Sequence, residues 1–395
     1  MLKWEEKDNF LCYYNIKDIL LSRETDKKTK FETRIFFGKM KIAIIGFGGM
    51  GDFHREKAVE RYNALEREEK IEVAGIYDIS PERCAYAESL GLRAFSSADE
   101  IWNDSSIEAV VIATPNDSHL PYVLRACEAG KHVIVEKPAG LSLDEVRKMY
   151  DAAEAAGVVF TPHQNRRVDD DFISIGRVIK SRELGECYRI ESRVMGANGI
   201  PGEWRKIPEC GGGMMLDWGV HLIDQMLCLI DDKIKSVYCT YSYRAGEAVD
   251  DGFTLDVGFE SGLIYRIVVD TNTFIKMPRW RAYFDDGTAA VTGWHNMKVE
   301  GHTVRCLVRK DDKLEGVSAG NGFTKTMATR RSETVEEKVL EHIKGEKTQI
   351  YRSFVEAIRG EGEMCVKRSE IERLFLVMEF AKRSAERNEV IKCLI

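Results

Sequence analysis

The sequence predicts an α/β protein with two domains, and three observations support this. From residue 41 to about residue 163, short apolar runs alternate with helical stretches, which is typical of a parallel sheet covered on both faces. Beyond residue 164 the runs are longer and rich in Val, Ile, Tyr and Thr, which favours a mostly antiparallel sheet. The length of 395 residues is sufficient for two hydrophobic cores. We divide the chain into residues 1–39, 40–163 and 164–395.

Residues 1–39 show no clear period before a strand-like segment starts at Met40. One interpretation is that the domain core begins at Met40, and that the preceding residues are an extension or a wrongly assigned start of translation. The alternative is a short helix around Tyr14–Leu21 that packs on the surface.

The first domain contains five apolar runs that are short enough to be buried strands. They are Ile42–Ile45, Ile71–Tyr77, Ala109–Ala113, His132–Val135 and Val158–Phe160. Helix signals lie between them. A Ser-Pro pair at 80–81 begins one helix, which Gly91 ends. Ser142 and Glu145 form a capping box ahead of another helix, which stops at Gly157.

The second domain begins with a predicted helix over Asp171–Lys180, which leads into four strand-like runs. These are Cys187–Val194, Ile234–Tyr243, Phe253–Phe259 and Leu263–Asp270. In the first run Tyr188 and Ile190 alternate with Arg189 and Glu191, which indicates a sheet with one polar face. Further helices are expected near Thr334–Lys344, Gln349–Arg359 and Ser369–Arg387.

Composition excludes several classes of protein. The net charge is −7, and acidic and basic residues are interspersed, so we expect neither nucleic acid nor a membrane surface as a partner. No apolar run approaches the length of a bilayer span, and the N-terminus lacks the features of a signal peptide. The ten cysteines are scattered, with no CxxC pair and no Cys/His cluster. They indicate reduced thiols, no metal site and a cytoplasmic location.

A glycine-rich turn directly follows the strand Ile42–Ile45. Its residues are Gly46, Phe47, Gly48, Gly49, Met50 and Gly51. In a GxGxxG pattern the first glycine allows a tight turn, the second lets the backbone approach a pyrophosphate, and the third lets helix and strand pack closely. The free N–H groups of the following helix attract phosphate. The position of this turn predicts a Rossmann dinucleotide-binding domain; the alternative is a glycine-rich turn without a ligand.

Asp78 follows the second strand, where a dinucleotide-binding fold places an acid against the adenosine ribose hydroxyls. A carboxylate there repels a 2′-phosphate, so NAD is favoured over NADP. The separation from the glycines exceeds the usual length, and a longer helix and loop over residues 56–70 would account for it. Alternatively, Asp78 only starts the turn before Ser80.

Two further strand ends carry polar residues. The first has Thr114, Pro115, Asn116 and His119, and the second has Glu136 and Lys137. Ligands of open parallel sheets bind at the carboxyl ends of strands, so we expect both segments at the cofactor cleft. The alternatives are an ordinary turn and a surface ion pair.

Three glycines at 211–213 precede a predicted helix on which Asp217, His221 and Asp224 share one face, at positions i, i+4 and i+7. A carboxylate one turn before a histidine orients its ring and raises its basicity, as a general base requires. The alternative is a buried His–Asp contact without a catalytic role.

Amide, guanidinium and aromatic side chains flank these motifs. Asn165, Arg166 and Arg167 follow the last strand of the first domain, and Trp204 and Arg205 precede the glycine run. Such a lining suits a sugar, a cyclitol or a sugar acid, although the arginines equally fit a structural role.

Together these motifs resemble the Gfo/Idh/MocA family of NAD(P)-dependent oxidoreductases, which includes inositol dehydrogenases and glucose–fructose oxidoreductase. The matching pieces are GFGGMGDFH with His54, ATPNDSH, VEKP, HQNRR with His163, and GGGMMLDWGVHLID. The resemblance runs from Met40 to the C-terminus. It implies a Rossmann domain and a C-terminal α/β domain whose open, largely antiparallel sheet supports a homodimer or homotetramer.

The resemblance also implies that Lys137, Asp217 and His221 surround the reacting carbinol of a sugar or polyol substrate. We expect His221 to take the hydroxyl proton while Lys137 holds the hydroxyl and hydride leaves for NAD. Asp217 would orient the substrate and the base. Two alternatives stay open, namely redox-neutral glycoside cleavage with bound NAD, and a non-catalytic NAD-binding sensor.

Overall fold

The computed structural model describes residues 39–67, 69–202, 204–275, 277–293, 303–310, 317–325, 330–341 and 343–395. Both interpretations of the N-terminal segment concern residues outside these ranges. Residues 39–395 form one compact unit.

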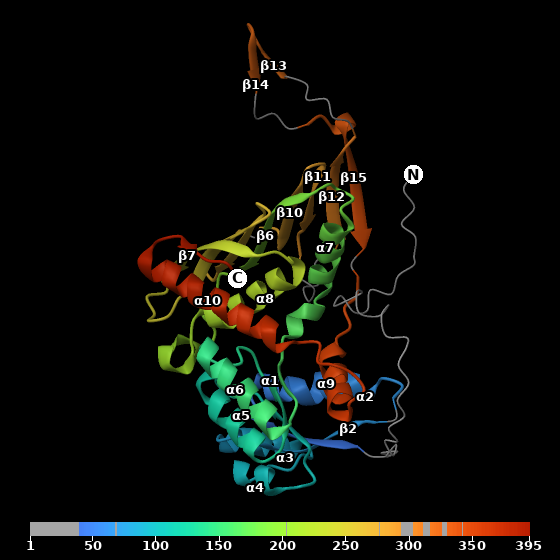
Figure 1. Ribbon diagram of the computed structural model, residues 1–395, viewed down its shortest axis with the longest axis vertical. Coiled ribbons are helices and arrows are strands. Elements are labelled where there is room, and N and C mark those ends of the chain that lie inside the picture. Colours follow the sequence, from blue (N-terminus) through green and yellow to red (C-terminus); the bar gives the residue numbers. More distant parts are fainter. Residues whose placement is uncertain are drawn as a thin grey trace. The chain divides into compact units, whose positions relative to one another are not determined.

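A five-stranded, all-parallel sheet forms the first domain, which is coloured blue to green in Figure 1. Its strands lie in the order β2-β1-β3-β4-β5. The strands are β1 (Met40–Ile45), β2 (Ile71–Tyr77), β3 (Ala109–Ile112), β4 (His132–Val135) and β5 (Phe160–Pro162). All five predicted strands are confirmed, with the fifth displaced by two residues. Because β2 and β3 lie on opposite sides of β1, the strand order reverses there, and this is where ligand crevices open in such sheets.

Helices cover both faces of this sheet. One face packs against α4 (Ala98–Asn103), α5 (His119–Glu128) and α6 (Leu143–Ala156). The other packs against α1 (Gly49–Phe53), η1 (His54–Val59), α2 (Glu60–Asn63), α3 (Pro81–Ser89) and α9 (Gln349–Arg359). The predicted division of the chain assigns α9 to the second domain, yet its Tyr351 and Phe354 belong to the core of the first sheet.

The predicted capping box is half formed. Ser142 Oγ accepts the Glu145 N–H at 3.2 Å, as expected. The Glu145 carboxylate accepts the N–H of Leu141 at 2.7 Å instead of that of Ser142. The helix ends at Gly157 in the left-handed conformation, φ 66°, as the sequence predicts.

A nine-stranded sheet forms the second domain, in the order β15-β12-β11-β10-β6-β9-β8-β7-β16. The strands predicted from the sequence are β6 (Cys187–Met195), β7 (Ile234–Ser242), β8 (Gly252–Phe259) and β9 (Ile264–Asp270). Those that no pattern indicated are β10 (Trp280–Phe284), β11 (Gly287–Val291), β12 (Thr303–Arg309) and β16 (Ile391–Lys392), besides a separate hairpin of β13 (Val317–Gly320) and β14 (Phe323–Lys325). In the nine-stranded sheet, neighbouring strands are antiparallel, except that β6 and β9 are parallel.

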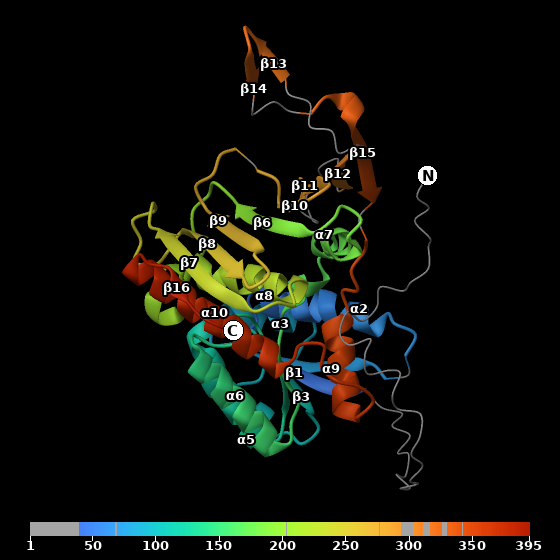
Figure 2. The same cartoon turned by 45° about the horizontal axis from the view of Figure 1, so that its top comes forward.

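One face of this sheet packs against α7 (Asp170–Ser181), α8 (Val220–Leu229) and α10 (Arg368–Arg387) (Figure 2). The other face presents polar side chains such as Arg189 and Arg266, which are exposed. The predicted α/β class, with a Rossmann-type parallel sheet and an open, mostly antiparallel second sheet, is therefore confirmed.

The prediction of a helix near Thr334–Lys344 is wrong. Residues Val335–Glu341 form strand β15, which pairs with β12 along its whole length. Arg305 on β12 also forms an ion pair with Glu337 on β15. Cross-strand pairing thus overrides the helical tendency of a segment rich in Glu and Lys.

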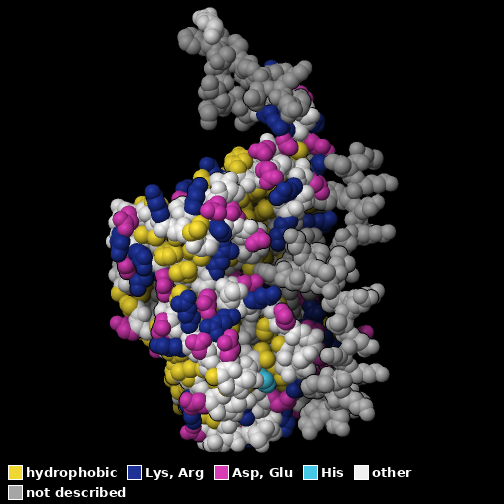
Figure 3. All heavy atoms as spheres, in the orientation of Figure 1, with side chains coloured by type: hydrophobic (Ala, Val, Ile, Leu, Met, Phe, Trp, Pro, Cys, Tyr) yellow, Lys and Arg dark blue, Asp and Glu magenta, His cyan; other side chains and the backbone are white. Residues whose placement is uncertain are grey.

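Within the described part of the chain, no helix has the length and apolar character needed to cross a bilayer. On the face drawn in Figure 3, basic side chains lie among acidic ones over both domains. The nine cysteines that the structure describes are all free thiols.

Candidate active site

A cleft of about 800 Å³ lies at the carboxyl ends of β1, β2, β3 and β4. It lies at the position that the reversed strand order predicts. The sequence-predicted site residues that line it are Gly46, Gly48, Gly49, Met50, Asp78, Thr114, Pro115, Asn116, Glu136, Lys137, Trp204, Arg205 and Asp217. Residues from both domains therefore meet in one cleft.

Other predicted site residues lie outside the lining. They are Phe47, Gly51, His119, Asn165, Arg166 and His221. The ring nitrogens of His119 lie 2.9 Å from the Pro138 carbonyl oxygen and 3.0 Å from that of Thr114. His119 therefore links two loops of the cleft. Conversely, Ile79, Arg83 and Tyr122 line the cleft, although no motif pointed to them.

The glycine turn and Asp78 fit a dinucleotide. A Cβ on Gly46 would lie 2.7 Å from the Ala113 carbonyl oxygen, whereas Cβ atoms on Gly48 and Gly49 would meet nothing within 4 Å. The turn is thus tight on the protein side and open on the cleft side, as a bound pyrophosphate requires. The Phe47 N–H donates to Asp78 Oδ2 at 2.6 Å, so the carboxylate lies directly against the turn.

Lys137 and Asp217 form an ion pair in the cleft. Lys137 Nζ donates to Asp217 Oδ1 at 2.8 Å and to the Asp217 carbonyl oxygen at 3.0 Å. Arg205 Nε lies 3.4 Å from Asp217 Oδ2. Burial alone would raise the pKa of Asp217, but the charges of Lys137 and Arg205 outweigh burial and lower it. Asp217 therefore carries a negative charge held between two cations.

His221 is 3% exposed, and its Nδ1 has no hydrogen-bond partner among the described residues. Burial, followed by the charges of Lys137 and Arg166, holds the pKa of His221 well below its usual value. The ring is therefore neutral at neutral pH. A buried polar atom without a partner is rare enough in native proteins to suggest a ligand or a catalytic role.

The structure contradicts the expected contact between Asp217 and His221. Residues Met215–Gly219 form a π-helical turn, η6, before α8 begins at Val220. The i, i+4 and i+7 spacing assumed a regular α-helix, and the wider π-helical turn departs from that geometry. Asp217 consequently pairs with Lys137 and Arg205 and not with His221.

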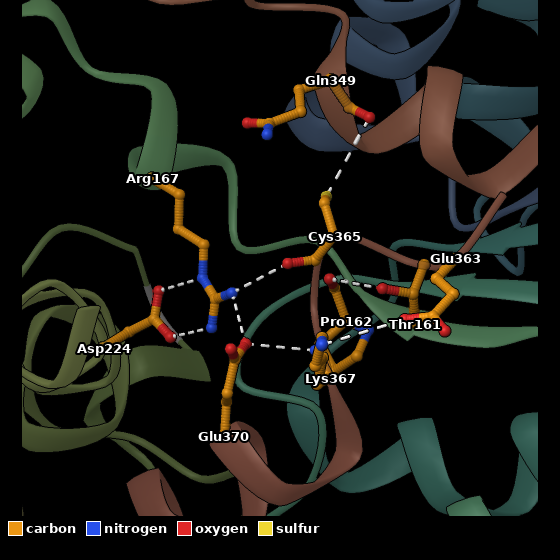
Figure 4. A network of polar contacts seen from close by, with 9 residues as sticks. All are labelled: Thr161, Pro162, Arg167, Asp224, Gln349, Glu363, Cys365, Lys367 and Glu370. Atoms are coloured by element: carbon orange, nitrogen blue, oxygen red, sulfur yellow. Dashed lines mark hydrogen bonds and ion pairs between the residues drawn. The ribbon is translucent and has the colours of Figure 1, made fainter. Parts of the chain in front are cut away.

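Asp224, the third residue of the predicted face, belongs to a buried structural network (Figure 4). Arg167 Nε and Nη2 donate to the two Asp224 carboxylate oxygens at 2.8 and 2.6 Å. Arg167 Nη1 donates to Glu370 Oε2 at 2.7 Å and to the Cys365 carbonyl oxygen at 3.2 Å. The network joins the segment after β5 to α8 and α10, so Arg167 has the structural role left open from the sequence.

The neighbouring residues Arg166 and Asn165 have different surroundings. The Arg166 guanidinium lies 4.6 Å from the centre of the Trp218 ring, and Nη1 donates to Asp169 at 2.9 Å. Asn165 Oδ1 is buried without a hydrogen-bond partner among the described residues.

Asp250 holds the start of the helix that carries Asp217, and sequence reasoning missed it. Its Oδ2 accepts the Met215 N–H at 2.8 Å, and its carbonyl oxygen accepts the Met214 N–H at 3.0 Å. Gly213 has φ 100°, and a Cβ on it would lie 2.2 Å from Asp250 Oδ1. Burial raises the pKa of Asp250 to about 6. No motif marks this aspartate, because it lies in a loop between two strands.

Glu136 is 4% exposed and is surrounded by N–H donors. His54 Nε2 lies 2.9 Å and His163 Nδ1 lies 2.7 Å from Glu136 Oε1. The Lys137 N–H donates to Glu136 Oε2 at 3.2 Å, and the Tyr351 hydroxyl lies 2.7 Å from His54 Nδ1. Tyr351 has no sequence signal, since it is 297 residues from His54.

Comparison with known proteins identifies the family. A model described as "Oxidoreductase family, NAD-binding Rossmann fold" matches residues 40–164, and one for the GFO/IDH/MocA C-terminal domain matches residues 172–290. The chain belongs to the Gfo/Idh/MocA family of oxidoreductases. The resemblance that the motifs indicated is thereby confirmed.

Individual Gfo/Idh/MocA relatives agree with this assignment. The uncharacterized oxidoreductase YhhX of Escherichia coli is 32% identical over 246 residues, which are 60% of this chain and 66% of the relative. The chain thus spans just under two thirds of that relative. A scyllo-inositol 2-dehydrogenase (NADP(+)), IolW of Bacillus subtilis, is 25% identical over 89% of this chain and 95% of its own. The structure of an NAD-binding protein from Listeria innocua superposes with a TM-score of 0.77 at 34% identity, covering 90% of this chain and 97% of that one.

Proposed function

We propose that this protein is an NAD-dependent dehydrogenase that transfers hydride between NAD and a secondary hydroxyl of a sugar, cyclitol or sugar derivative. The observation that carries the proposal is the Lys137–Asp217 ion pair, which lies in the same cleft as the glycine turn. A cation fixed beside a dinucleotide cleft stabilises the alkoxide that develops as hydride leaves a carbinol.

The residues of the first domain would hold the cofactor. Gly48 and Gly49 leave space for the pyrophosphate, and the Asp78 carboxylate would accept hydrogen bonds from the adenosine ribose hydroxyls. A fixed negative charge at Asp78 opposes a 2′-phosphate, which supports NAD over NADP. When bound, the cofactor would accept the hydride that leaves the carbinol carbon of the substrate.

The second domain would supply the base. Neutral His221 accepts the hydroxyl proton, while Lys137 holds the same oxygen and balances its developing charge. Asp217 keeps the Lys137 ammonium in place through the bond at 2.8 Å. His221 itself is 3% exposed and is not among the residues that line the cleft.

The cleft wall and the family support the proposed substrate class. Trp204 and Arg205 line the cleft together, with the guanidinium 4.4 Å from the ring centre, and such surfaces stack on sugar rings and donate hydrogen bonds to hydroxyls. Asn165, with its buried free oxygen, and Arg166 would complete the substrate contacts. Relatives at 24–37% identity are named as 1,5-anhydro-D-fructose reductase and as inositol dehydrogenases. We expect a cytoplasmic homodimer or homotetramer that associates through the open face of the second sheet.

A screen for NADH formation tests the proposal. Purified protein is mixed with NAD or NADP and with inositols, aldoses, glycosides or uronic acids, with Lys137→Ala as the blank. Absorbance at the NADH band that requires both substrate and Lys137 supports a dehydrogenase and names its substrate class. Cofactor binding without net NADH, but with glycoside cleavage, would contradict it in favour of redox-neutral chemistry. Binding without any turnover would indicate a sensor.

A further inference from the structure

One buried carboxylate in the cleft has no part in the mechanism above. Glu136 lines the cleft and directly precedes Lys137. Its Oε1 accepts from His54 and His163, and its Oε2 accepts the Lys137 N–H. Three N–H groups from separate parts of the chain therefore converge on one carboxylate. A group fixed this firmly in a ligand cleft calls for an explanation.

The proton positions follow from Tyr351. Burial raises the pKa of Tyr351, so its hydroxyl keeps the proton and donates to His54 Nδ1. Burial lowers the pKa of His54, so its neutral ring carries its single proton on Nε2 and donates it to Glu136. His163 donates through Nδ1. Burial alone would raise the pKa of Glu136, but the interaction with His163, followed by the hydrogen bond from His54, holds it well below its usual value.

A metal ion does not explain this cluster. The ligand atoms of His54, Glu136 and His163 do lie within 4.8 Å of one another. However, the two N···O distances are 2.7 and 2.9 Å, which are those of hydrogen bonds. Ligands about 2 Å from a tetrahedral ion lie roughly 3.3 Å apart.

Glu136 lies at the end of the cleft where hydride transfer takes place. The acceptor ring must be adjacent to the carbinol that Lys137 holds, and Glu136 is the residue before Lys137. Asp78 follows β2, and in the sheet order β1 and β3 lie between β2 and β4, so the adenosine ribose belongs at the opposite end. The Lys137 charge is already balanced by Asp217, so it does not cancel the charge of Glu136.

The two forms of the cofactor differ in charge at this end of the cleft, because the oxidised nicotinamide ring is cationic and the reduced ring is neutral.

We propose that Glu136, held by His54 and His163, is a fixed buried anion that favours binding of the oxidised, cationic cofactor over the reduced one. The proposal rests on the proposed function, because the role assigned there to Lys137 places the nicotinamide ring beside Glu136. It makes Glu136 a specificity-determining residue for the redox state of the cofactor. A rigid charge acts in this way because two cofactor forms of the same shape differ by one unit of charge.

The test compares dissociation constants for NAD and NADH, measured by titration calorimetry. Glu136→Gln removes the charge and keeps the shape. Its amide N–H groups donate to His54 and His163 after a tautomer change, while its oxygen accepts from Lys137, so we expect it to fold. The ratio of NAD affinity to NADH affinity should fall about tenfold or more. Glu209→Gln is the matched control, because Glu209 is exposed on η5 (Pro208–Cys210), and it should leave the ratio within about twofold.

Two further variants separate charge from structure. Tyr351→Phe leaves the Glu136 charge in place, so it should lower the melting temperature and leave the ratio unchanged. Lys137→Met removes the positive charge of the residue that follows Glu136 and keeps the backbone N–H that donates to Glu136 Oε2, so it should raise the ratio. It serves as an independent arm if Glu136→Gln does not fold. The proposal would be overturned if folded Glu136→Gln kept the wild-type ratio of NAD affinity to NADH affinity, or if this ratio fell in Lys137→Met. Wild-type protein that binds neither NAD nor NADH would instead refute the proposed function, whereas binding without turnover leaves the ratio measurable.

Discussion

Lys137 Nζ and Asp217 Oδ1 lie 2.8 Å apart, although the two residues are 80 positions apart and belong to different domains. Lys137 follows β4 of the parallel sheet, and Asp217 lies on η6, ahead of the helix that covers the second sheet. Asn116 Nδ2 adds a second link between the domains by donating to the Gly211 carbonyl oxygen at 3.0 Å. The candidate active site therefore exists only when the two domains are packed together.

Replacing His221 tests its role as the base. His221→Ala should lower turnover by about 10²–10⁴-fold, because general-base catalysis typically contributes that factor. Cofactor binding should persist, since His221 does not line the cleft. The wild-type rate should also show no titration near the ordinary histidine pKa, because the pKa of His221 is held well below it. Steady-state kinetics over pH 5.5–8.5 and NAD titrations provide both measurements; near-normal turnover in the variant would exclude His221.

Replacement by alanine should have different effects at two glycines of the same turn, lowering NAD affinity at one and stability at the other. A Cβ on Gly48 meets nothing within 4 Å, so Gly48→Ala should fold with nearly wild-type stability but lose affinity for NAD about tenfold or more. A Cβ on Gly51 would lie 2.1 Å from the Gly46 carbonyl oxygen, so Gly51→Ala should be destabilised. Thermal melts and NAD titrations of both variants check this. Equal NAD affinity in wild type and Gly48→Ala would show that the pyrophosphate binds elsewhere.

The sequence predicts the parallel sheet well because each of its strands and helices is marked by residues within or next to that element. Each strand there is a short, mostly apolar run, and Ser142 and Gly157 mark the ends of their helix. The cleft followed because strand ends and the glycine turn fix its position. The strand β15 was missed because its Glu-rich sequence has a helical tendency, and its conformation depends on β12, about thirty residues earlier.

Side-chain partners were less predictable than strands. The spacing of Asp217 and His221 suggested a contact, but the π-helical turn at Met215–Gly219 has no recognisable sequence signal. The bond from Tyr351 to His54 depends on α9 packing against the first sheet. Such contacts join segments that only the tertiary fold brings together.

The Arg167 network should contribute to stability and not to chemistry. Arg167→Met leaves Asp224 and Glu370 without their shared cation, and breaking a buried pair costs about 3–5 kcal/mol. Arg266→Met is the matched control, because Arg266 also binds one aspartate through two bonds of 2.7 Å but is exposed. An exposed pair contributes at most about 1 kcal/mol. Urea unfolding of both variants measures the difference, and equal losses would refute the structural role of Arg167.

Asp250 gives a prediction about pH. Burial raises its pKa to about 6 in the folded protein, whereas the unfolded chain titrates near 3.8. Between these values the unfolded state binds fewer protons than the folded state, so the contribution of Asp250 to stability falls as the pH rises. Asp250→Asn removes this group, and its amide oxygen still accepts the Met215 N–H. The free energy of unfolding of the variant, minus that of wild type, should therefore increase by about 2–3 kcal/mol between pH 4 and pH 7. Urea unfolding at pH 4, 5, 6 and 7 measures this difference, in which other titrating groups cancel. A difference that stays constant with pH would show that Asp250 ionises normally in the folded protein.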